Sequence, residues 1–287
     1  MRSDEEDAAK CNLLVAYPYC TTNLLSALRR HQGSVRFLLD SGAFTAFMAG
    51  KAVELNDYER FVKSLQDAGV DVWRYFTLDV IGNPAETRRN YDTLLSRGLT
   101  PIPIFTRGED PKAIEDYYAM SDVVAIGGVV GTNDPAGFIN GMMRHVGNRR
   151  VHWLGFTRRE FLKHYRPYMC DSSSYSETAR YGWLNLYAGG GHWYETISRH
   201  EFRKPIPPRL ERILQDYGLS SAMLVRNAAW HGAGASRTAS RMSWARWQYD
   251  IGRQLNVRLF ISVSVEKDFE WFVEHHNYWK ERTCRVG

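Results

Sequence analysis

The sequence has few cysteines, and their arrangement predicts neither a metal site nor a disulfide framework. The four are Cys11, Cys20, Cys170 and Cys284. No pair is spaced C-x-x-C, and no group of cysteines and histidines has zinc-finger spacing. We therefore expect free thiols in a reducing compartment, and neither a metal ion nor another cofactor.

Long hydrophobic runs are absent as well. No apolar stretch approaches the roughly 20 residues that a membrane-spanning helix needs. The first seven residues are mostly acidic, and no apolar signal-peptide region follows them. The sequence predicts a soluble, cytoplasmic protein with no membrane partner, and it leaves the oligomeric state open.

The 287 residues, 44% of them hydrophobic, suit one large α/β domain with a modest appendage. Asn83-Pro84 and Asp134-Pro135 predict helix starts, and Thr157 with Glu160 has the form of a capping box. Helices of this kind alternate with predicted strands at residues 12–17, 36–41, 72–80, 100–105, 123–128, 151–156 and 168–172.

Strands that alternate with helices form parallel sheets, and seven strands before residue 173 are too many for one small sheet. We predict a (β/α)8 TIM-like barrel within residues 1–200. Its eighth strand is either 183–187 or 258–262, and the pattern does not choose between them. Residues 201–287 are predicted to be mainly helical, packing on the barrel or completing it.

Positive charge is concentrated in two segments. Residues 144–166 hold seven Lys or Arg against Glu160 alone, a net of +6, and residues 226–258 hold six Arg against Asp250 alone, a net of +5. Such segments suit a polyanion such as DNA. Tryptophans and a tyrosine interleave with the arginines of the second segment, either as base contacts or as core. The predicted nucleic-acid contacts are Arg149, Arg150, Arg158, Arg159, Arg237, Arg241 and Arg246.

Three aspartates each close a short apolar run: Asp40, Asp79 and Asp171. A carboxylate at the end of a buried strand is costly to desolvate. The C-terminal ends of barrel strands share one rim, where the active sites of such barrels lie. We therefore expect these three acids, far apart in the sequence, to meet at a single site.

Two further motifs follow predicted strands. Asp40-Ser41-Gly42-Ala43-Phe44 combines an acid, small residues that permit a sharp turn, and an aromatic face. Gly127 and Gly128 leave a strand with bare backbone, which suits contact with a planar ligand. Their spacing is not the dinucleotide-binding fingerprint.

Each of these residues also has a purely structural interpretation. A strand-end aspartate often caps the next helix or pairs with an arginine, and Asp79 lies close to the predicted cap Asn83. His152, inside a predicted strand, is interpreted as barrel packing or a pocket wall. Arg107 either neutralises one of the acids or is solvated. A structural role for all three acids at once is the weaker explanation.

Paired carboxylates can divide glycosidic chemistry between them, one attacking the anomeric carbon while the other moves protons. The same logic covers an N-glycosidic bond. An aromatic ring and a glycine floor beside the acids favour a planar base over a sugar ring. With the basic segments, this predicts an enzyme that acts on a nucleotide within a nucleic acid.

The ordered motifs resemble the tRNA-guanine transglycosylase superfamily. They are Asp40–Phe44, Leu78-Asp79-Val80, residues 101–105, Ile126-Gly127-Gly128, Gly155-Phe156-Thr157 and Asp171-Ser172-Ser173. The chain is most similar to the phage branch, the DpdA-like enzymes that place 7-deazaguanine bases in DNA. The resemblance covers roughly residues 12–182, and it implies the host cytoplasm as the location if the protein is phage-encoded.

By this resemblance, Asp171 is the nucleophile that attacks C1′ of a deoxyguanosine, and Asp40 is the general acid/base. Asp79 and Ser41 belong to the base-binding set, where Phe44 stacks on the base and Gly127 and Gly128 contact it through their backbone. The co-substrate is a free 7-deazaguanine base, and the target base leaves the helix to reach the site.

The chain departs from the bacterial tRNA-acting enzymes at several points. Their zinc module has no counterpart, Ala43 replaces a second glycine, and Thr106 and Arg107 stand where a glutamine is expected. The absent zinc module favours DNA over tRNA, and the changed pocket leaves the identity of the incoming base open. The residues alone still leave open a tRNA enzyme, an O-glycosidase barrel and a nucleic-acid-binding module without catalysis.

Overall fold

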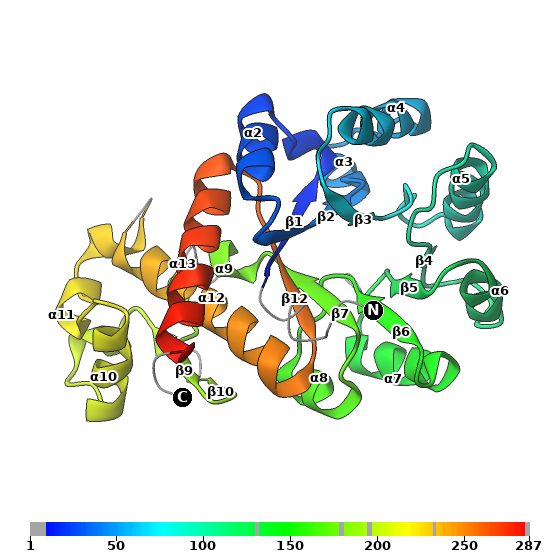
Figure 1. Ribbon diagram of the computed structural model, residues 1–287. Coiled ribbons are helices and arrows are strands. Elements are labelled where there is room, and N and C mark those ends of the chain that lie inside the picture. The colour runs from blue at the N-terminus through cyan, green and yellow to red at the C-terminus, as the bar shows by residue number, and fades with distance from the viewer. Residues whose placement is uncertain (1–9, 130–131, 178–180, 194–196, 232–233, 285–287) are drawn as a thin grey trace. The chain divides into compact units, whose positions relative to one another are not determined.

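The computed structural model describes residues 10–129, 132–177, 181–193, 197–231 and 234–284 (Figure 1). Contacts within the chain divide it into two compact units. One comprises residues 12–172 and 257–270, and the other comprises the remaining described residues. The first unit holds the large sheet and all three predicted carboxylates.

The large sheet has eight strands, and every strand pairing within it is parallel. Their order is β3-β2-β1-β12-β7-β6-β5-β4. An additional bridge between Phe76 and Ile102 joins the two edges, where the Ile102 N–H donates to the Tyr75 carbonyl at 2.8 Å. The strands are β1 Cys11–Ala16, β2 Val35–Asp40, β3 Val72–Tyr75, β4 Ile104–Phe105, β5 Val123–Ile126, β6 Arg150–Trp153, β7 Met169–Ser172 and β12 Arg258–Ser262.

This sheet and its helices confirm the predicted α/β barrel of the (β/α)8 type. The eighth strand is β12, which lies between β1 and β7. The alternative segment at 183–187 forms no part of this sheet, because its strands β8 (Trp183–Leu184) and β9 (Tyr187–Gly189) pair only in two-stranded antiparallel sheets.

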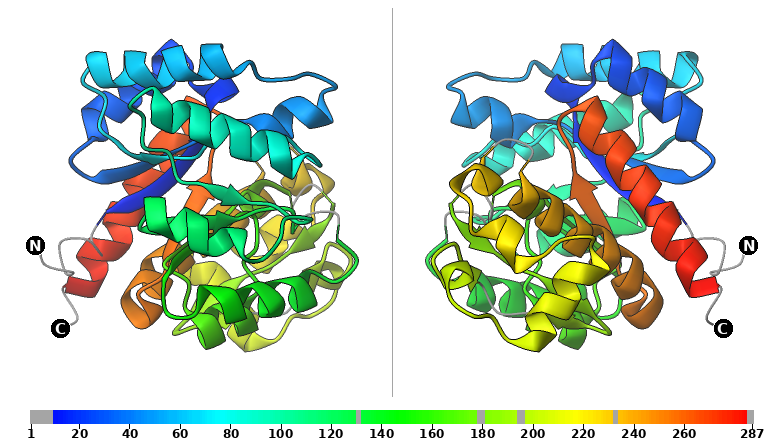
Figure 2. Two further views of the ribbon diagram at one scale, coloured as in Figure 1. Left: turned by 90° about the vertical axis from the view of Figure 1, so that its right-hand side faces the viewer. Right: turned by 90° about the vertical axis from the view of Figure 1, so that its left-hand side faces the viewer.

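Helices connect the strands and lie outside the sheet (Figures 1 and 2). Asn83 and Asp134 cap α5 and α7 as predicted, each accepting a hydrogen bond from a backbone N–H three residues on. The predicted capping box at Thr157 is wrong, because Arg158 is the N-cap of α8 and forms no side-chain cap. The helices are α2 Thr22–His31, α3 Ala43–Met48, α4 Leu55–Asp67, α5 Pro84–Ser96, α6 Ala113–Met120, α7 Pro135–Val146 and α8 Arg159–Tyr165.

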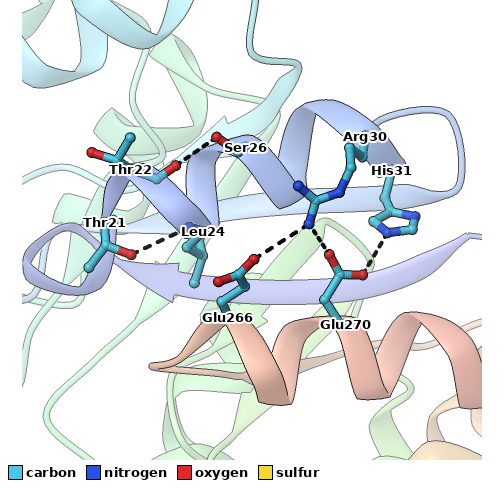
Figure 3. A network of polar contacts seen from close by, with 8 residues as sticks. All are labelled: Thr21, Thr22, Leu24, Ser26, Arg30, His31, Glu266 and Glu270. Atoms are coloured by element: carbon cyan, nitrogen blue, oxygen red, sulfur yellow. Dashed lines mark hydrogen bonds and ion pairs between the residues drawn. The ribbon is translucent and has the colours of Figure 1, made fainter.

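The beginning of α13 (Glu266–Cys284) is tied to the end of α2 by ion pairs (Figure 3). Glu270 accepts from Arg30 and lies 2.7 Å from Nε2 of His31, and Glu266 lies 3.5 Å from Arg30. These side chains are substantially exposed, so each pair contributes little to stability.

Side chains from the strands fill the barrel interior. Alternate residues of a strand point to the same face, so Arg36, Leu38 and Asp40 of β2 all point inward. Arg36 lies near the start of the strand and Asp40 is its last residue. The buried interior cluster is Leu14, Leu38, Phe76, Ile102, Ile104, Val123, Ala125, Met169 and Phe260.

Arginines gather where the strands begin, and we call Arg36, Arg74, Arg150 and Arg258 the arginine end. Two aromatic rings form cation–π contacts with these four arginines. Arg36 and Arg74 lie over Trp73, and Arg150 and Arg258 lie over Tyr168. Asp122 accepts from Arg74 at 2.8 Å and from Arg150 at 3.1 Å. Arg36, only 2% exposed, donates to Asn12 Oδ1 at 2.6 Å.

The other unit is mainly helical, with the two small antiparallel sheets. The longest helix of this unit, α12 (Ala235–Leu255), is buried along most of its length. Its Trp244 and Trp247 side chains belong to the core of the unit. No helix in the described ranges has the length and apolarity required to cross a membrane. The further elements are α9 Ser174–Glu177, β10 His192–Trp193, β11 Ile197–Ser198, α10 Pro208–Asp216, α11 Ser221–Leu224 and α12 Ala235–Leu255.

Candidate active site

The three predicted carboxylates gather where the barrel strands end, and we call Asp40, Asp79 and Asp171 the carboxylate end. Asp40 is the last residue of β2, Asp171 is the third residue of β7, and Asp79 follows β3. The charges of Asp79 and Asp171 both raise the pKa of Asp40. The structure therefore brings the three acids within electrostatic reach of one another.

The carboxyl group of Asp40 is strongly perturbed. Burial, followed by the charges of Asp79 and Asp171, raises its pKa from 3.8 to about 7. The Gly42 N–H, which donates to Oδ2 at 2.9 Å, and the Ser41 backbone oppose this shift. Near neutral pH both protonation states are populated, which suits a group that must give and take a proton.

Ser41 links Asp40 to Asp79. Its buried hydroxyl donates to Asp79 Oδ1 at 3.0 Å and accepts from the Ala43 N–H at 3.3 Å. Burial raises the pKa of Asp79, and the Ser41 hydrogen bond opposes that effect. Asp79 does not cap the next helix, because Asn83 does so.

Asp171 is held by two donors on one oxygen. Nε2 of His152 lies 2.9 Å from Oδ1, and the Gly155 N–H donates to the same atom at 3.0 Å. The described residues offer Oδ2 no hydrogen-bond donor. The arrangement fixes the plane of the carboxylate and leaves one oxygen without a protein donor.

His152 is the site residue to which sequence reasoning gave no chemical role, having interpreted it as barrel packing or a pocket wall. It is completely buried, and its Nδ1 has no hydrogen-bond partner in the described part of the protein. The hydrogen bond to Asp171 therefore places the ring proton on Nε2. The missed signal was strand alternation, which puts His152 on the inward face of β6, opposite Met169 and beside the strand that carries Asp171.

Gly127 and Gly128 lie at the same end of the barrel, directly after β5. A Cβ atom on Gly127 would come within 3.0 Å of Ile104 Cγ2, and one on Gly128, whose φ is +72°, within 3.0 Å of Arg107 N and Cβ. Close packing disfavours a side chain at Gly127, and the positive φ together with the close approach of Arg107 favours glycine at position 128. The Gly127 N–H already donates to the Phe105 carbonyl at 2.8 Å, so its free polar group is the carbonyl.

Phe44 lies on α3, the helix that begins directly after the Asp40-Ser41-Gly42 turn. Gly42 has φ +76°, and a Cβ there would come within 2.3 Å of Pro18 Cδ. The ring of Phe44 is 47% exposed, although α3 carries other apolar side chains in the same condition. Its exposure leaves a face for a ligand to contact.

The predicted cations of the first basic segment separate into two groups. Arg158 and Arg159 follow the C-terminal end of β6, near Gly155. Arg149 and Arg150 lie at the beginning of the same strand, where Arg149 forms two hydrogen bonds to Glu115 and Arg150 pairs with Asp122. The structure does not bring Arg149 and Arg150 to the carboxylate end.

The predicted cations of the second basic segment lie on α12 in the other unit. Arg241 is buried and lies over the Trp271 ring, and Arg246 lies over Trp279 with Asp216 at 3.8 Å. Arg237 is half-buried and also has a partner. The interleaved aromatics of this segment, Trp230, Trp244, Trp247 and Tyr249, are core residues.

Two cysteines close to the site, Cys20 and Cys170, are poorly suited to act as nucleophiles. Burial raises the pKa of the Cys20 thiol to about 12, with a contribution from the charge of Asp40, and burial keeps the Cys170 thiol protonated in the same way by raising its pKa. Cys11, Cys20 and Cys170 are free thiols. The side chain of Cys284 lies outside the described part of the chain.

No group of three His, Cys, Asp or Glu side chains in the described ranges could hold a metal ion. That the protein uses no cofactor stays a prediction. Comparisons with models of known families, with curated proteins and with solved structures find no match to this chain.

Proposed function

We propose that the protein is a transglycosylase that exchanges guanine in DNA for a 7-deazaguanine base, with Asp171 as nucleophile and Asp40 as general acid/base. One observation carries this proposal above the others. Asp40, with a pKa near 7, lies in the field of a second carboxylate, Asp171, which two donors hold in place. Two carboxyl groups in different environments are the usual means of dividing acid/base and nucleophilic roles.

In the first step, an oxygen of Asp171 attacks C1′ of the flipped deoxyguanosine and the bond from C1′ to N9 breaks. Protonated Asp40 donates its proton to the departing guanine, so the base leaves neutral. The products are a deoxyribosyl ester of Asp171, an ionised Asp40 and free guanine. His152 and Gly155 occupy Oδ1, so Oδ2 is the oxygen placed to attack.

In the second step, ionised Asp40 removes the N9 proton of the incoming 7-deazaguanine. N9 then attacks C1′, the ester bond breaks, and the Asp171 carboxylate is regenerated. Two displacements at C1′ retain the configuration of the nucleoside. Asp79 accepts hydrogen bonds from the N1 and N2 edge of the base, and Phe44 stacks on it.

The test is base exchange by the purified protein, measured as incorporation of labelled guanine into duplex DNA. We expect exchange and a covalent protein–DNA species on a denaturing gel. Asp171→Asn removes the nucleophile and should reduce exchange by more than about 10^4-fold, with no covalent species. Asp92→Asn, at an exposed aspartate paired with Arg88, is the matched control and should act as wild type.

Three outcomes would overturn the proposal. Exchange into tRNA but not DNA would assign the chemistry to the other nucleic acid. Hydrolysis of glycosides without any base exchange would identify an O-glycosidase. Undiminished exchange by Asp171→Asn would remove the proposed nucleophile.

A further inference from the structure

Arg107 occupies a fixed place at the carboxylate end that neither basic segment accounts for. It follows β4, and its backbone N and Cβ pack against Gly128, which follows β5. The loop that carries it is closed by Glu109, whose Oε1 accepts from the Thr106 N–H at 2.7 Å and from the Thr106 hydroxyl at 2.9 Å. The backbone of Arg107 is thus held beside the proposed base-binding glycines.

The guanidinium of Arg107 has no carboxylate partner in the described part of the chain, and its side chain is exposed. The nearest acid in sequence, Glu109, is fully engaged, because Tyr117 donates to its Oε2 at 3.0 Å while Thr106 occupies Oε1. Arg158, which follows the neighbouring strand β6, is exposed and likewise forms no ion pair with a described residue.

Unpaired cations at the carboxylate end lower the electrostatic cost of bringing DNA there. Three clustered carboxylates repel a polyanion, and bringing a DNA strand to them requires positive charge nearby. At the arginine end, by contrast, Arg74 and Arg150 share Asp122. Arg107 and Arg158 are exposed cations that form no ion pair with a described residue, and their loops lie at the carboxylate end, where a phosphate must approach.

We propose that Arg107 and Arg158 bind the backbone phosphates of DNA that flank the flipped nucleotide. This inference rests on the proposed function, since it assumes that DNA is the substrate of the carboxylate end. Arg107 lies beside Gly128. Arg158 follows Leu154 by four residues, and Leu154 packs on Gly127. The two guanidinium groups thus belong to neighbouring loops beside the base site.

The experiment measures DNA affinity as a function of salt, which counts phosphate contacts. Binding of a duplex oligonucleotide, and separately of tRNA, is measured between 50 and 200 mM salt in an Asp171→Asn background, so that no covalent species forms. Arg107→Gln and Arg158→Gln are compared with Arg60→Gln, whose exposed side chain on α4 pairs with Asp57. Wild-type exchange into DNA and tRNA is measured in parallel.

We expect each of Arg107→Gln and Arg158→Gln to reduce the slope of log K against log salt by about 0.9, and the double variant by about 1.8. Arg60→Gln should leave the slope unchanged. Unchanged slopes in both variants, with wild-type exchange intact, would overturn this inference and leave the proposed function standing.

Two further outcomes separate the hypotheses. Changed slopes without any base exchange would support the phosphate contacts and overturn the transglycosylase activity. Absence of DNA binding by the parent protein, or slope changes seen with tRNA alone, would overturn the assignment of these arginines to DNA.

Discussion

The two ends of the barrel interior differ in the partners that they give to their charged side chains. At the arginine end, guanidinium groups lie over Trp73 and Tyr168, and Asp122 has its pKa lowered, chiefly by its hydrogen bond from Arg74. At the carboxylate end, three acids lie together, and burial and mutual repulsion raise the pKa of Asp40 to about 7. The arginine end gives its cations carboxylate, amide and aromatic partners, whereas the three acids of the carboxylate end have no Arg or Lys partner among the described residues.

This difference teaches which end is organised for stability and which for chemistry. A fold selected for stability alone has no reason to hold three carboxylates together with only hydroxyl, imidazole and backbone donors. Perturbed acids of this kind are characteristic of functional sites. Changing the charges at each end should therefore change stability in opposite directions.

After Asp171→Asn, the largest effect is expected for Asp40→Asn. We expect exchange activity to fall by about 10^2- to 10^4-fold, because the proton donor and acceptor is lost. The same change should raise the free energy of unfolding at pH 8 by roughly 3 kcal/mol, because a buried repelling charge is removed. Denaturant unfolding and labelled-guanine exchange measure the two quantities.

The pH dependence gives a control for this stability gain. The folded protein holds the Asp40 proton more tightly than the unfolded chain does, so wild-type stability contributed by this group falls as pH rises from about 4 to about 7. The advantage of Asp40→Asn should vanish near pH 4. A variant that is less stable than wild type at pH 8 would contradict the comparison between the two ends.

Arg36→Met tests the arginine end, and its effect should have the opposite sign. Losing the buried hydrogen bond to Asn12 and the contact with Trp73 should destabilise the protein by about 3 kcal/mol. Exchange per folded molecule should stay within about two-fold of wild type. Arg60→Met, at an exposed arginine, is the matched control and should change stability by less than about 0.5 kcal/mol.

His152→Leu should have an intermediate effect, confined to catalysis. Removing the donor to Asp171 frees the carboxylate to rotate, so we expect kcat to fall by about 10- to 100-fold while DNA affinity is retained. His152→Gln keeps a donor and should recover part of the loss. Equal kcat values in the two variants would show that His152 only fills space.

The smallest effect is expected for Asp122→Asn. The Asp122 side chain is half exposed, so its pairs with Arg74 and Arg150 should together contribute less than about 1 kcal/mol. Because the folded state lowers the pKa of Asp122, this contribution is present at neutral pH and is lost as the pH falls toward 3. Thermal unfolding at pH 7 and pH 3 measures the difference, and a loss of several kcal/mol at pH 7 would contradict it.

Much of the fold could be predicted from local sequence pattern. Seven of the eight strands, the caps Asn83 and Asp134, and the position of the three acids at or soon after the ends of strands all follow from features within a few residues. The capping box at Thr157 failed because the chain enters α8 with Arg158 as its N-cap. Local pattern left the eighth strand undecided, since two short segments fitted it equally well.

Long-range partners account for the rest. Arg149 and Arg158 lie in the same basic segment, yet β6 carries the chain from one end of the barrel to the other between them. The aromatic residues between the arginines of α12 were equally compatible with base contacts and with core. In the structure, Trp244 and Trp247 are buried and belong to the core.

The sequence by itself determined the alternation of strands and helices and therefore the shared end at which Asp40, Asp79 and Asp171 meet. Only the tertiary structure decided that β12 completes the sheet, that His152 holds Asp171, and which arginines are already paired. The reason is that periodicity and capping act over a few residues, whereas strand order, register and ion pairing depend on which distant segments come into contact.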